Sequence, residues 1–423
     1  MVATVPLYPL AACAYLAAER STSPATVGMS TTPALRLEAL QAGHADPAAV
    51  QAIVGLPAGS PVAVAMSGGV DSSAVAGLLV EAGYRVFGIT ARLYDVAAPS
   101  HRPGSCCAPD DARDARAVAH HLGIRHYVVD ERAAFLAQVV QPFLDAWANA
   151  QTPNPCVQCN RSLKFDALLG LARDLGGAAM ATGHYARLQP DGRGGHTLHR
   201  ARDPAKDQAY FLFPLVPNTA RALRFPLGDL TKAQVRAHAD RLGLPTAAKR
   251  ESMDVCFIGG QRPQDWLQPR LGTQPGPVVD VRGAPIGEHD GLHAVTVGQR
   301  HGLRISRGAP DAAPLYVLDK RPDGTVVVGQ RDQLRAAWLH LAGCSWVGGQ
   351  PPAPGDQLAV QVRHRGQPVD CTVAQVSHDG MTVALCVLAD LFAAARGQAG
   401  VLFTGDQVVG GGTIQSARPG ELG

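Results

Sequence analysis

The 423-residue sequence has few aromatic residues, little net charge and few cysteines. Aromatic residues make up 5% of the chain, and a net charge of +3 is too small to indicate nucleic-acid binding by itself. Nine irregularly spaced cysteines exclude the disulfide scaffold of a small secreted protein. They suit a reducing compartment in which single thiols do chemistry, so we expect a cytoplasmic protein.

The sequence also lacks the run of about 18 apolar residues that a membrane-spanning helix needs. Residues 4–18 are apolar, but no basic segment precedes them, which argues against a signal peptide. We expect residues 1–57 to be a poorly structured extension with one short helix, and Met29 is an alternative start. The remaining length is enough for about two or three domains.

Residues 58–265 alternate between strand and helix patterns. Such β-α repetition predicts an α/β domain with a doubly wound parallel sheet, whose ligands bind at the carboxyl ends of the strands. Prolines interrupt one segment, "TPNPCVQCN", which we interpret as a loop over 152–160. We expect strands at 61–66, 84–93, 124–130 and 178–188, and helices at 72–83, 111–123, 133–149 and 161–176.

The second half of the chain is rich in short β-type runs separated by Pro and Gly. We expect a β-rich central connector over 266–336, with strand patterns at 276–283, 292–305 and 314–330. A small antiparallel β-barrel is expected over 337–423, where apolar and polar residues alternate in several segments. No internal repeat is present in the sequence.

The stretch "AMSGGVDSS" lies between the first expected strand and the first expected helix. Glycines allow a ligand to approach the backbone closely, and a helix that begins here points unpaired N–H groups at the loop. These features predict an anion site, most simply for phosphate. No Gly-Lys-Ser/Thr follows, so it is not a Walker P-loop. Its residues are Ala65, Met66, Ser67, Gly68, Gly69, Val70, Asp71, Ser72 and Ser73.

Cysteines form the second candidate site. Cys156 and Cys159 make a C-x-x-C in "NPCVQCN", and Cys256 stands alone in "DVCFIGG". Spacing alone leaves open a zinc half-site, a redox pair or half of a cluster site, although no second C-x-x-C completes a zinc ribbon. Cys106 and Cys107 follow the second expected strand on the ligand side, and their role stays open.

The phosphate loop resembles the PP-loop of ATP pyrophosphatases, which split ATP between the α and β phosphates. "TPNPCVQCNRSLKF", "ATGHYAR", "KDQAYFLF" and "MDVCFIGG" then follow in the order expected of the tRNA-specific 2-thiouridylase family. "GEHDGLHAVTVGQRHGL" and the closing "GGGTI" continue the resemblance, which spans about residue 60 to the C-terminus.

This resemblance implies an enzyme that replaces the C2 oxygen of the wobble uridine of tRNA with sulfur. ATP, with Mg²⁺ on Asp71, adenylates the oxygen, and sulfur arrives as a cysteine persulfide. Cys256 matches the family's persulfide carrier, and Cys159 matches the nucleophile that attacks the sulfur–sulfur bond. A Cys159–Cys256 disulfide remains and is reset by reductant. A sulfur-donor protein is the implied partner besides tRNA.

Cys156 departs from the commonest family pattern, in which an aspartate contacts the target base. The departure raises an alternative chemistry. Cys156, Cys159 and Cys256 could hold a 4Fe-4S cluster through three thiolates, with the fourth iron open to bind sulfide. More remote alternatives are a PP-loop synthetase for a small molecule and a non-catalytic RNA-binding protein.

The resemblance also assigns further binding residues. The barrel segment contains four Arg, no Lys and six acids, so its composition does not itself predict RNA binding. Besides the PP-loop, the expected ATP contacts are Ala91 and Gly183. The expected tRNA contacts are Asn154, Pro155, Cys156, His184, Lys206, Asp207, Gln208, Arg363, His364 and Gln398.

Overall fold

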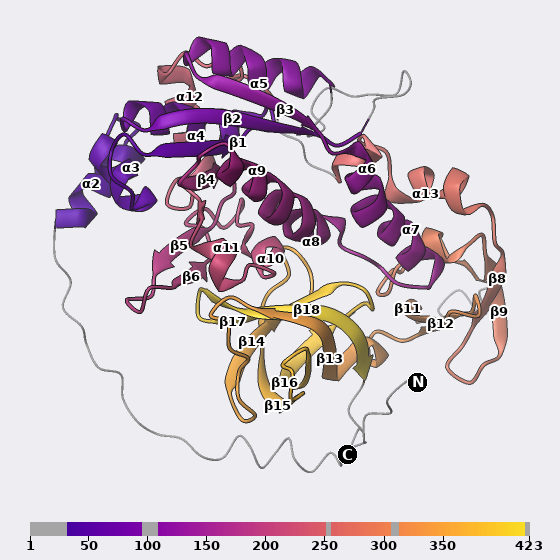
Figure 1. Ribbon diagram of the computed structural model, residues 1–423. Coiled ribbons are helices and arrows are strands. Elements are labelled where there is room, and N and C mark those ends of the chain that lie inside the picture. The colour runs from indigo at the N-terminus through magenta and orange to yellow at the C-terminus, as the bar shows by residue number, and fades with distance from the viewer. Residues whose placement is uncertain (1–31, 95–108, 251–254, 306–312, 419–423) are drawn as a thin grey trace.

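The computed structural model describes residues 32–94, 109–250, 255–305 and 313–418. Cys106 and Cys107 lie outside these residues. Figure 1 shows three parts, which we call the head (α2 to η3), the central domain (β8 to β12) and the barrel (β13 to β18). Among the described residues, no helix has the length and apolar character needed to cross a membrane.

A five-stranded parallel sheet forms the head, in the order β3-β2-β1-β4-β7. Val62 and Val64 of the central strand pack into one apolar cluster, and Ala63 packs into another on the opposite face. Both faces are therefore covered, as parallel sheets require, and the predicted doubly wound sheet is confirmed. The strands are β1 (Pro61–Ala65), β2 (Arg85–Arg92), β3 (Arg125–Asp130), β4 (Ala179–Thr182) and β7 (Leu223–Arg224).

Helices of the head connect these strands, and a segment of π-helix occurs in two of them. Helix α13 (Pro263–Leu271) links the head to the central domain. The remaining helical elements are α2 (Thr32–Gln41), α3 (Pro47–Val54), α4 (Val70–Glu81), α5 (Pro109–His121), α6 (Arg132–Phe135), η1 (Leu136–Val140), α7 (Gln141–Ala148), α8 (Pro155–Cys159), η2 (Asn160–Leu168), α9 (Leu169–Asp174), α10 (Ala209–Leu212), α11 (Pro217–Ala220), α12 (Lys232–Arg241) and η3 (Cys256–Ile258).

Helices α2 and α3 lie in the segment for which we expected one short helix. Leu40, Val50 and Val54 are buried in the apolar cluster of the head. The Asp46 side chain accepts a hydrogen bond from the N–H of Ala49 at 2.9 Å and caps α3. Helices α2 and α3 therefore belong to the head. The sequence did not predict this, because apolar residues in this segment do not follow a clear helical period.

The C-x-x-C segment lies on a helix, and the loop expected over 152–160 is wrong in its second half. Helix α8 begins at Pro155 and continues directly into η2. Proline is tolerated there because the first N–H of a helix has no intrahelical partner. Cys156 and Cys159 are therefore three positions apart on one helix, where such residues are neighbours.

The strand expected over 178–188 is also divided. It comprises β4 and the first residues of β5 (Arg187–Pro190), with residues 183–186 between them. Because Gly183 and the residues after it leave the sheet at the carboxyl end of β4, they are available to line the ligand site.

The central domain contains a five-stranded sheet in the order β10-β9-β8-β12-β11. The strand expected over 292–305 is largely wrong: Gly298 and Gly302 adopt positive φ angles, which an extended strand does not allow. Its elements are β8 (Gly276–Val279), β9 (Pro285–His289), η4 (Leu292–Ala294), β10 (Arg304–Ile305), β11 (Tyr316–Lys320), β12 (Val326–Gly329) and η5 (Asp332–Leu334).

The predicted antiparallel barrel is confirmed. Strand β13 pairs with both β16 and β18, which closes the order β13-β16-β15-β14-β17-β18 on itself. Closure leaves no open edge among these strands. They are β13 (Arg335–Trp346), β14 (Gln357–Gln361), β15 (Val369–Val376), β16 (Thr382–Phe392), β17 (Ala399–Thr404) and β18 (Gln407–Arg418).

The head and the barrel share a sheet. A hairpin of the head, β5 and β6 (His196–His199), extends the barrel because β6 pairs antiparallel with β18. Figure 1 shows the hairpin descending from the head toward the barrel. The barrel is therefore joined to the head by main-chain hydrogen bonds as well as by side chains.

Candidate active site

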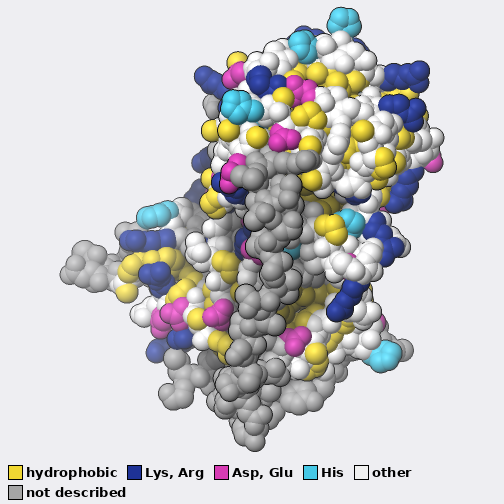
Figure 2. All heavy atoms as spheres, turned by 90° about the vertical axis from the view of Figure 1, so that its left-hand side faces the viewer, with side chains coloured by type: hydrophobic (Ala, Val, Ile, Leu, Met, Phe, Trp, Pro, Cys, Tyr) yellow, Lys and Arg dark blue, Asp and Glu magenta, His cyan; other side chains and the backbone are white. Residues whose placement is uncertain are grey.

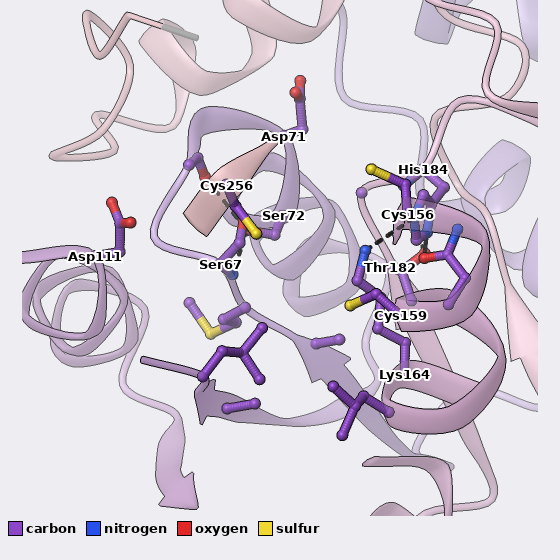
Figure 3. Close-up of a pocket in the computed structure, with 18 of the residues that line it drawn as sticks. Ser67, Asp71, Ser72, Asp111, Cys156, Cys159, Lys164, Thr182, His184 and Cys256 are labelled. Carbon is purple, nitrogen blue, oxygen red and sulfur yellow. Dashed lines mark hydrogen bonds between the residues drawn. The ribbon is translucent and has the colours of Figure 1, made fainter. Parts of the chain in front are cut away.

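A cavity of about 370 Å³ opens at the carboxyl ends of the parallel strands, where ligand binding was predicted (Figure 3). Ala65 and Met66 line it from the end of β1, Ala91 and Leu93 from β2, and Gly183 from the end of β4. These five residues come from the ends of three strands, which the parallel sheet brings together.

The PP-loop is shaped by close backbone contacts. Gly68 has φ +69°, and a Cβ atom there would lie 2.1 Å from the carbonyl oxygen of Asp111. The Ser73 hydroxyl donates to the Gly69 carbonyl at 2.8 Å and is buried, so it stabilises the loop itself. Ser67 and Ser72 line the cavity, where they can meet a ligand.

Position 183 also has no room for a side chain. A Cβ atom at this position would lie 2.8 Å from the backbone nitrogen of Ser72. The end of β4 therefore lies against the first turn of α4 without an intervening side chain.

Asp71 in the first turn of α4 is held by two residues that sequence reasoning missed. The Tyr185 hydroxyl donates to Asp71 Oδ1 at 2.7 Å, and Lys232 Nζ donates to the same oxygen at 2.6 Å. Lys232 is 161 positions away along the chain, at the start of α12. The ammonium adds positive charge beside the PP-loop.

A second lysine contacts the loop from another direction. Lys249 Nζ donates to the Gly68 carbonyl at 3.0 Å, to Asp111 Oδ1 at 2.6 Å and to Asp114 Oδ2 at 2.6 Å. Burial lowers the pKa of Lys249, but the hydrogen bonds to Asp111 and Asp114 outweigh burial and leave that pKa above its usual value. Lys249 therefore stays charged and ties the PP-loop to α5.

His184 lies in the wall of the cavity and is neutral. Burial, followed by the nearby Lys164 charge, holds the pKa of His184 well below its usual value. Its Nδ1 lies 2.8 Å from Thr182 Oγ1, and its Nε2 lies 3.4 Å from Lys164 Nζ. Because Lys164 can only donate, Nε2 accepts and Nδ1 carries the proton.

Cys156, Cys159 and Cys256 line the same cavity as the PP-loop. Figure 3 shows Cys256 beside Ser67 and Ser72, with Cys156 and Cys159 across the cavity on α8. Cys156 is exposed, whereas Cys159 and Cys256 are half-buried, and none of them is in a disulfide.

Cys256 is positioned by its neighbours. The Tyr94 hydroxyl donates to the Cys256 carbonyl at 3.0 Å. The next residue, Phe257, packs against Phe135 and Trp266, with ring centroids 5.7 and 5.1 Å away. These contacts hold the backbone of Cys256 at the wall of the cavity, which the residue lines.

The three thiols do not form a metal-ligand set. Within the described parts of the chain, no three His, Cys, Asp or Glu side chains are grouped closely enough to hold a metal ion. The 4Fe-4S alternative is not favoured by the family to which the relatives reported below belong. A single carboxylate on Asp71 still suits Mg²⁺, because phosphate oxygens and water complete such sites.

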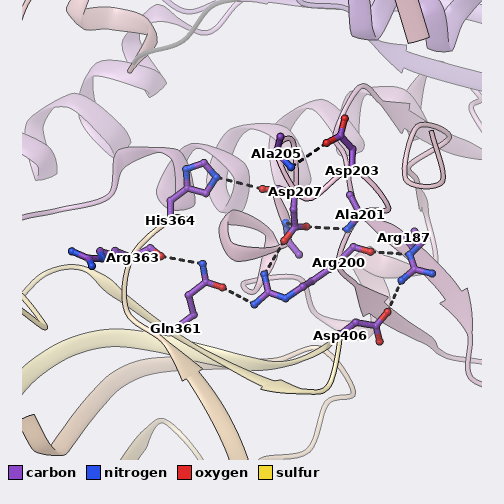
Figure 4. Close-up of polar contacts among 11 residues, drawn as sticks. Arg187, Arg200, Ala201, Asp203, Ala205, Asp207, Gln361, Arg363, His364 and Asp406 are labelled. Carbon is purple, nitrogen blue, oxygen red and sulfur yellow. Dashed lines mark hydrogen bonds and ion pairs between the residues drawn. The ribbon is translucent and has the colours of Figure 1, made fainter. Parts of the chain in front are cut away.

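The predicted tRNA contacts fall into two groups. Pro155, Cys156, His184, Lys206 and Gln208 line the cavity. Four more lie toward or in the barrel: Arg363 and His364 follow β14, Gln398 precedes β17, and Asp207 turns toward Arg200 (Figure 4). Asn154 directly precedes α8.

Three family models match consecutive parts of the chain. The tRNA methyl transferase HUP domain matches residues 60–260, the tRNA methyl transferase PRC-barrel domain residues 264–330, and the aminomethyltransferase beta-barrel domain residues 338–414. These three stretches follow one another in the order of the head, the central domain and the barrel.

Fold and site together define a PP-loop nucleotide-binding enzyme with three thiols at its cavity. The chain is 46% identical to the tRNA-specific 2-thiouridylase MnmA of Methylorubrum extorquens, over 84% of this chain and 93% of that protein. It is 44% identical to the same-named protein of Caulobacter vibrioides, over 86% of this chain and 97% of that protein. The chain belongs to the tRNA-specific 2-thiouridylase family, which confirms the family predicted from the sequence.

Proposed function

We propose that the protein uses ATP to replace the C2 oxygen of the wobble uridine of tRNA with sulfur, carried as a persulfide on Cys256. The observation that carries this proposal is that the PP-loop, Cys159 and Cys256 line one cavity. Activation of an oxygen by ATP and delivery of sulfur by a thiol then occur at one place.

Adenylation comes first, because a uridine carbonyl oxygen is a poor leaving group. The PP-loop amides and the N-terminus of α4 hold the phosphates, and the uridine O2 attacks the α-phosphorus. The α–β bridging bond breaks and pyrophosphate leaves. Lys232 and Lys249 stabilise the negative charge that develops on it. Mg²⁺ on Asp71 would supply further charge neutralisation.

Sulfur transfer follows. The terminal sulfur of the Cys256 persulfide adds to C2 of the adenylated uridine. The Cys159 thiolate then attacks Sγ of Cys256, the sulfur–sulfur bond breaks, and its electron pair stays with the transferred sulfur. AMP departs with the former C2 oxygen. The remaining Cys159–Cys256 disulfide is reduced by an external dithiol or by two thiol molecules, which supply two electrons and leave as a disulfide; this suits a reducing cytoplasm.

Binding of tRNA uses the cavity mouth and the barrel. Lys206 and Gln208 lie at the cavity, and Arg363 and His364 lie on the barrel near the same loop. Figure 2 shows one face of the molecule, which carries both basic and acidic side chains. The barrel segment has four Arg, no Lys and six acids, so its contacts to tRNA are a few placed cations and not a broad basic surface. A sulfur-donor protein loads the persulfide.

The test separates the two half-reactions. Cys256→Ser is expected to abolish 2-thiouridine formation, measured by mass spectrometry of digested tRNA, while tRNA-dependent pyrophosphate release continues. Cys159→Ser is expected to give the same pattern. Wild-type protein that forms no 2-thiouridine with ATP, tRNA and a persulfide donor would overturn the proposal.

A further inference from the structure

Arg200, which follows β6, contacts both the head and the barrel at their junction (Figure 4). Its guanidinium donates to Asp207 Oδ2 at 2.8 Å and to Gln361 Oε1 at 2.7 Å. The same group lies 3.8 Å from the ring centroid of Phe403. Asp207 belongs to the head, whereas Gln361 and Phe403 lie on barrel strands β14 and β17. One side chain therefore joins a head loop to two strands of the barrel.

The Asp207 side chain is nearly buried and is hydrogen-bonded within the protein. Its Oδ1 accepts hydrogen bonds from the backbone N–H groups of Ala201 and Ala209 at 3.0 and 3.2 Å, and its side chain is only 9% exposed. The carboxylate thus shapes the loop 206–208 through its contacts within the protein. Removal of Arg200 would leave this nearly buried carboxylate without its cation, which is costly.

The same loop reaches the catalytic cavity through Gln208. Its Oε1 accepts from the Tyr185 N–H at 2.9 Å, and its own N–H donates to the Tyr185 carbonyl at 2.9 Å. Tyr185 in turn donates its hydroxyl to Asp71 of the PP-loop. Hydrogen bonds through Tyr185 therefore link this loop to the PP-loop.

Barrel residues are fixed to the loop from the other side. Gln361 Nε2 donates to the Arg363 carbonyl at 3.0 Å. The His364 ring lies 4.5 Å from the Phe211 ring, and its Nε2 lies 3.4 Å from the Asp207 carbonyl. Arg363 and His364 are the barrel residues that the proposed function assigns to tRNA.

We propose that Arg200 is a positioning residue that aligns the barrel's tRNA contacts with the PP-loop through the Asp207 loop. This inference rests on the proposed function and deepens it. Docking of tRNA on the barrel then presents the uridine to the cavity in the alignment that adenylation requires. Small misplacements of reacting groups cost large factors in rate, so the effect of Arg200 should appear in the tRNA-dependent step.

The experiment compares Arg200→Gln and Arg200→Lys with Asp406→Asn in the full-length protein. Asp406 pairs with Arg187 and His199 at the same junction but does not contact the 206–208 loop, so its variant controls for general loosening. The measurements are kcat and KM for tRNA in pyrophosphate release, ATP affinity without tRNA, and thermal unfolding.

Arg200→Gln is expected to lower kcat/KM for tRNA by about 10- to 100-fold, with ATP affinity changed by less than about twofold. The kcat/KM of Arg200→Lys is expected to fall between those of Arg200→Gln and wild type, since lysine keeps the charge but lacks the planar guanidinium that donates to two partners and lies over the Phe403 ring. Asp406→Asn is expected to match wild type. The double variant Arg200→Gln/Asp207→Asn should be no worse than Arg200→Gln alone, because the two residues act as one unit.

Equal kinetics of the Arg200→Gln and Asp406→Asn variants would overturn the inference, as would a parallel loss of ATP affinity and folding. If Arg200→Gln does not fold, Arg200→Lys decides: wild-type kcat/KM for tRNA in that variant overturns the inference. Wild-type protein without 2-thiouridine formation would instead overturn the proposed function, and the role of Arg200 with it.

Discussion

At the scale of single residues, Asp71 shows how the site combines opposite charges. Tyr185 and Lys232 both donate to Oδ1 of the carboxylate, which leaves Oδ2 for a cation bound with ATP. A lysine at the first position of α12 is unfavourable for the helix dipole. That local conflict is the signal in the sequence that could have identified Lys232 as a functional residue.

Asp71→Asn is expected to abolish tRNA-dependent pyrophosphate release. The amide keeps the shape and can still accept from Tyr185 and Lys232, so the fold should persist. It removes the charge that would hold Mg²⁺, an effect on the order of several kcal/mol, or at least about 100-fold in rate. Pyrophosphate release measures the loss, with the unfolding temperature as control. Undiminished release would refute the role of Asp71.

Cys156→Ser is expected to leave substantial 2-thiouridine formation. In persulfide chemistry Cys156 is a neighbour of the target base, whereas Cys159 and Cys256 carry the sulfur and the disulfide. The matched control is Cys159→Ser, three positions away on the same helix, which should stop thiolation. Thiolation is measured on digested tRNA. Equal loss in both variants would contradict this division of roles.

At the scale of elements, the sequence predicted those parts of the site that come from one continuous segment of the chain. The PP-loop was predictable because a strand, two glycines and a helix follow one another directly. The contacts of Lys232 and Lys249 were not, because they join residues 161 and 138 positions apart. Helix α8 was missed because proline was taken as a helix breaker, although it starts helices well.

Gly68→Ala is expected to weaken ATP binding strongly. A left-handed backbone conformation costs a non-glycine residue roughly 1–2 kcal/mol, and here the new Cβ would also lie 2.1 Å from the Asp111 carbonyl oxygen. Gly123→Ala is the matched control, since Gly123 has φ +65° and nothing lies within 4 Å of the added Cβ. Equilibrium ATP binding and thermal unfolding distinguish the two. Similar ATP affinities in both variants would contradict a tightly built loop.

At the scale of the whole molecule, the order of the parts was predictable but their junctions were not. Strand-and-helix periodicity predicted a parallel head, and β-type runs predicted the barrel. The pairing of His199 with Gln407 joins distant strands, and no local pattern encodes it. A second junction, between the head and the central domain, contains the buried Lys320 of β11. Its amine lies 4.4 Å from the Trp147 ring centroid and donates to the Gln151 carbonyl at 3.3 Å.

Lys320 makes the stability of this junction depend on pH. Burial lowers the pKa of Lys320 to about 7, and Asp319 opposes burial only in part. The facing His293 has a pKa lowered mainly by its own burial. Between pH 10.5, the ordinary pKa of lysine, and about 7, the unfolded chain binds a proton that the folded chain does not. Stability is therefore lost as the pH falls through this range, and the loss levels off below about 7.

Lys320→Met is expected to raise the unfolding temperature at pH 7, because methionine fills a similar volume without a buried amine. The advantage over wild type should shrink as the pH rises from 7 toward 10, because loss of the lysine's proton on folding costs less free energy as the pH approaches the ordinary pKa of 10.5. Arg321→Met, at the exposed neighbouring position, controls for the loss of one positive charge. Thermal unfolding at pH 7 and near pH 10 supplies the four comparisons. An advantage of Lys320→Met that is the same at both pH values would show that the buried amine does not set the pH dependence of this junction.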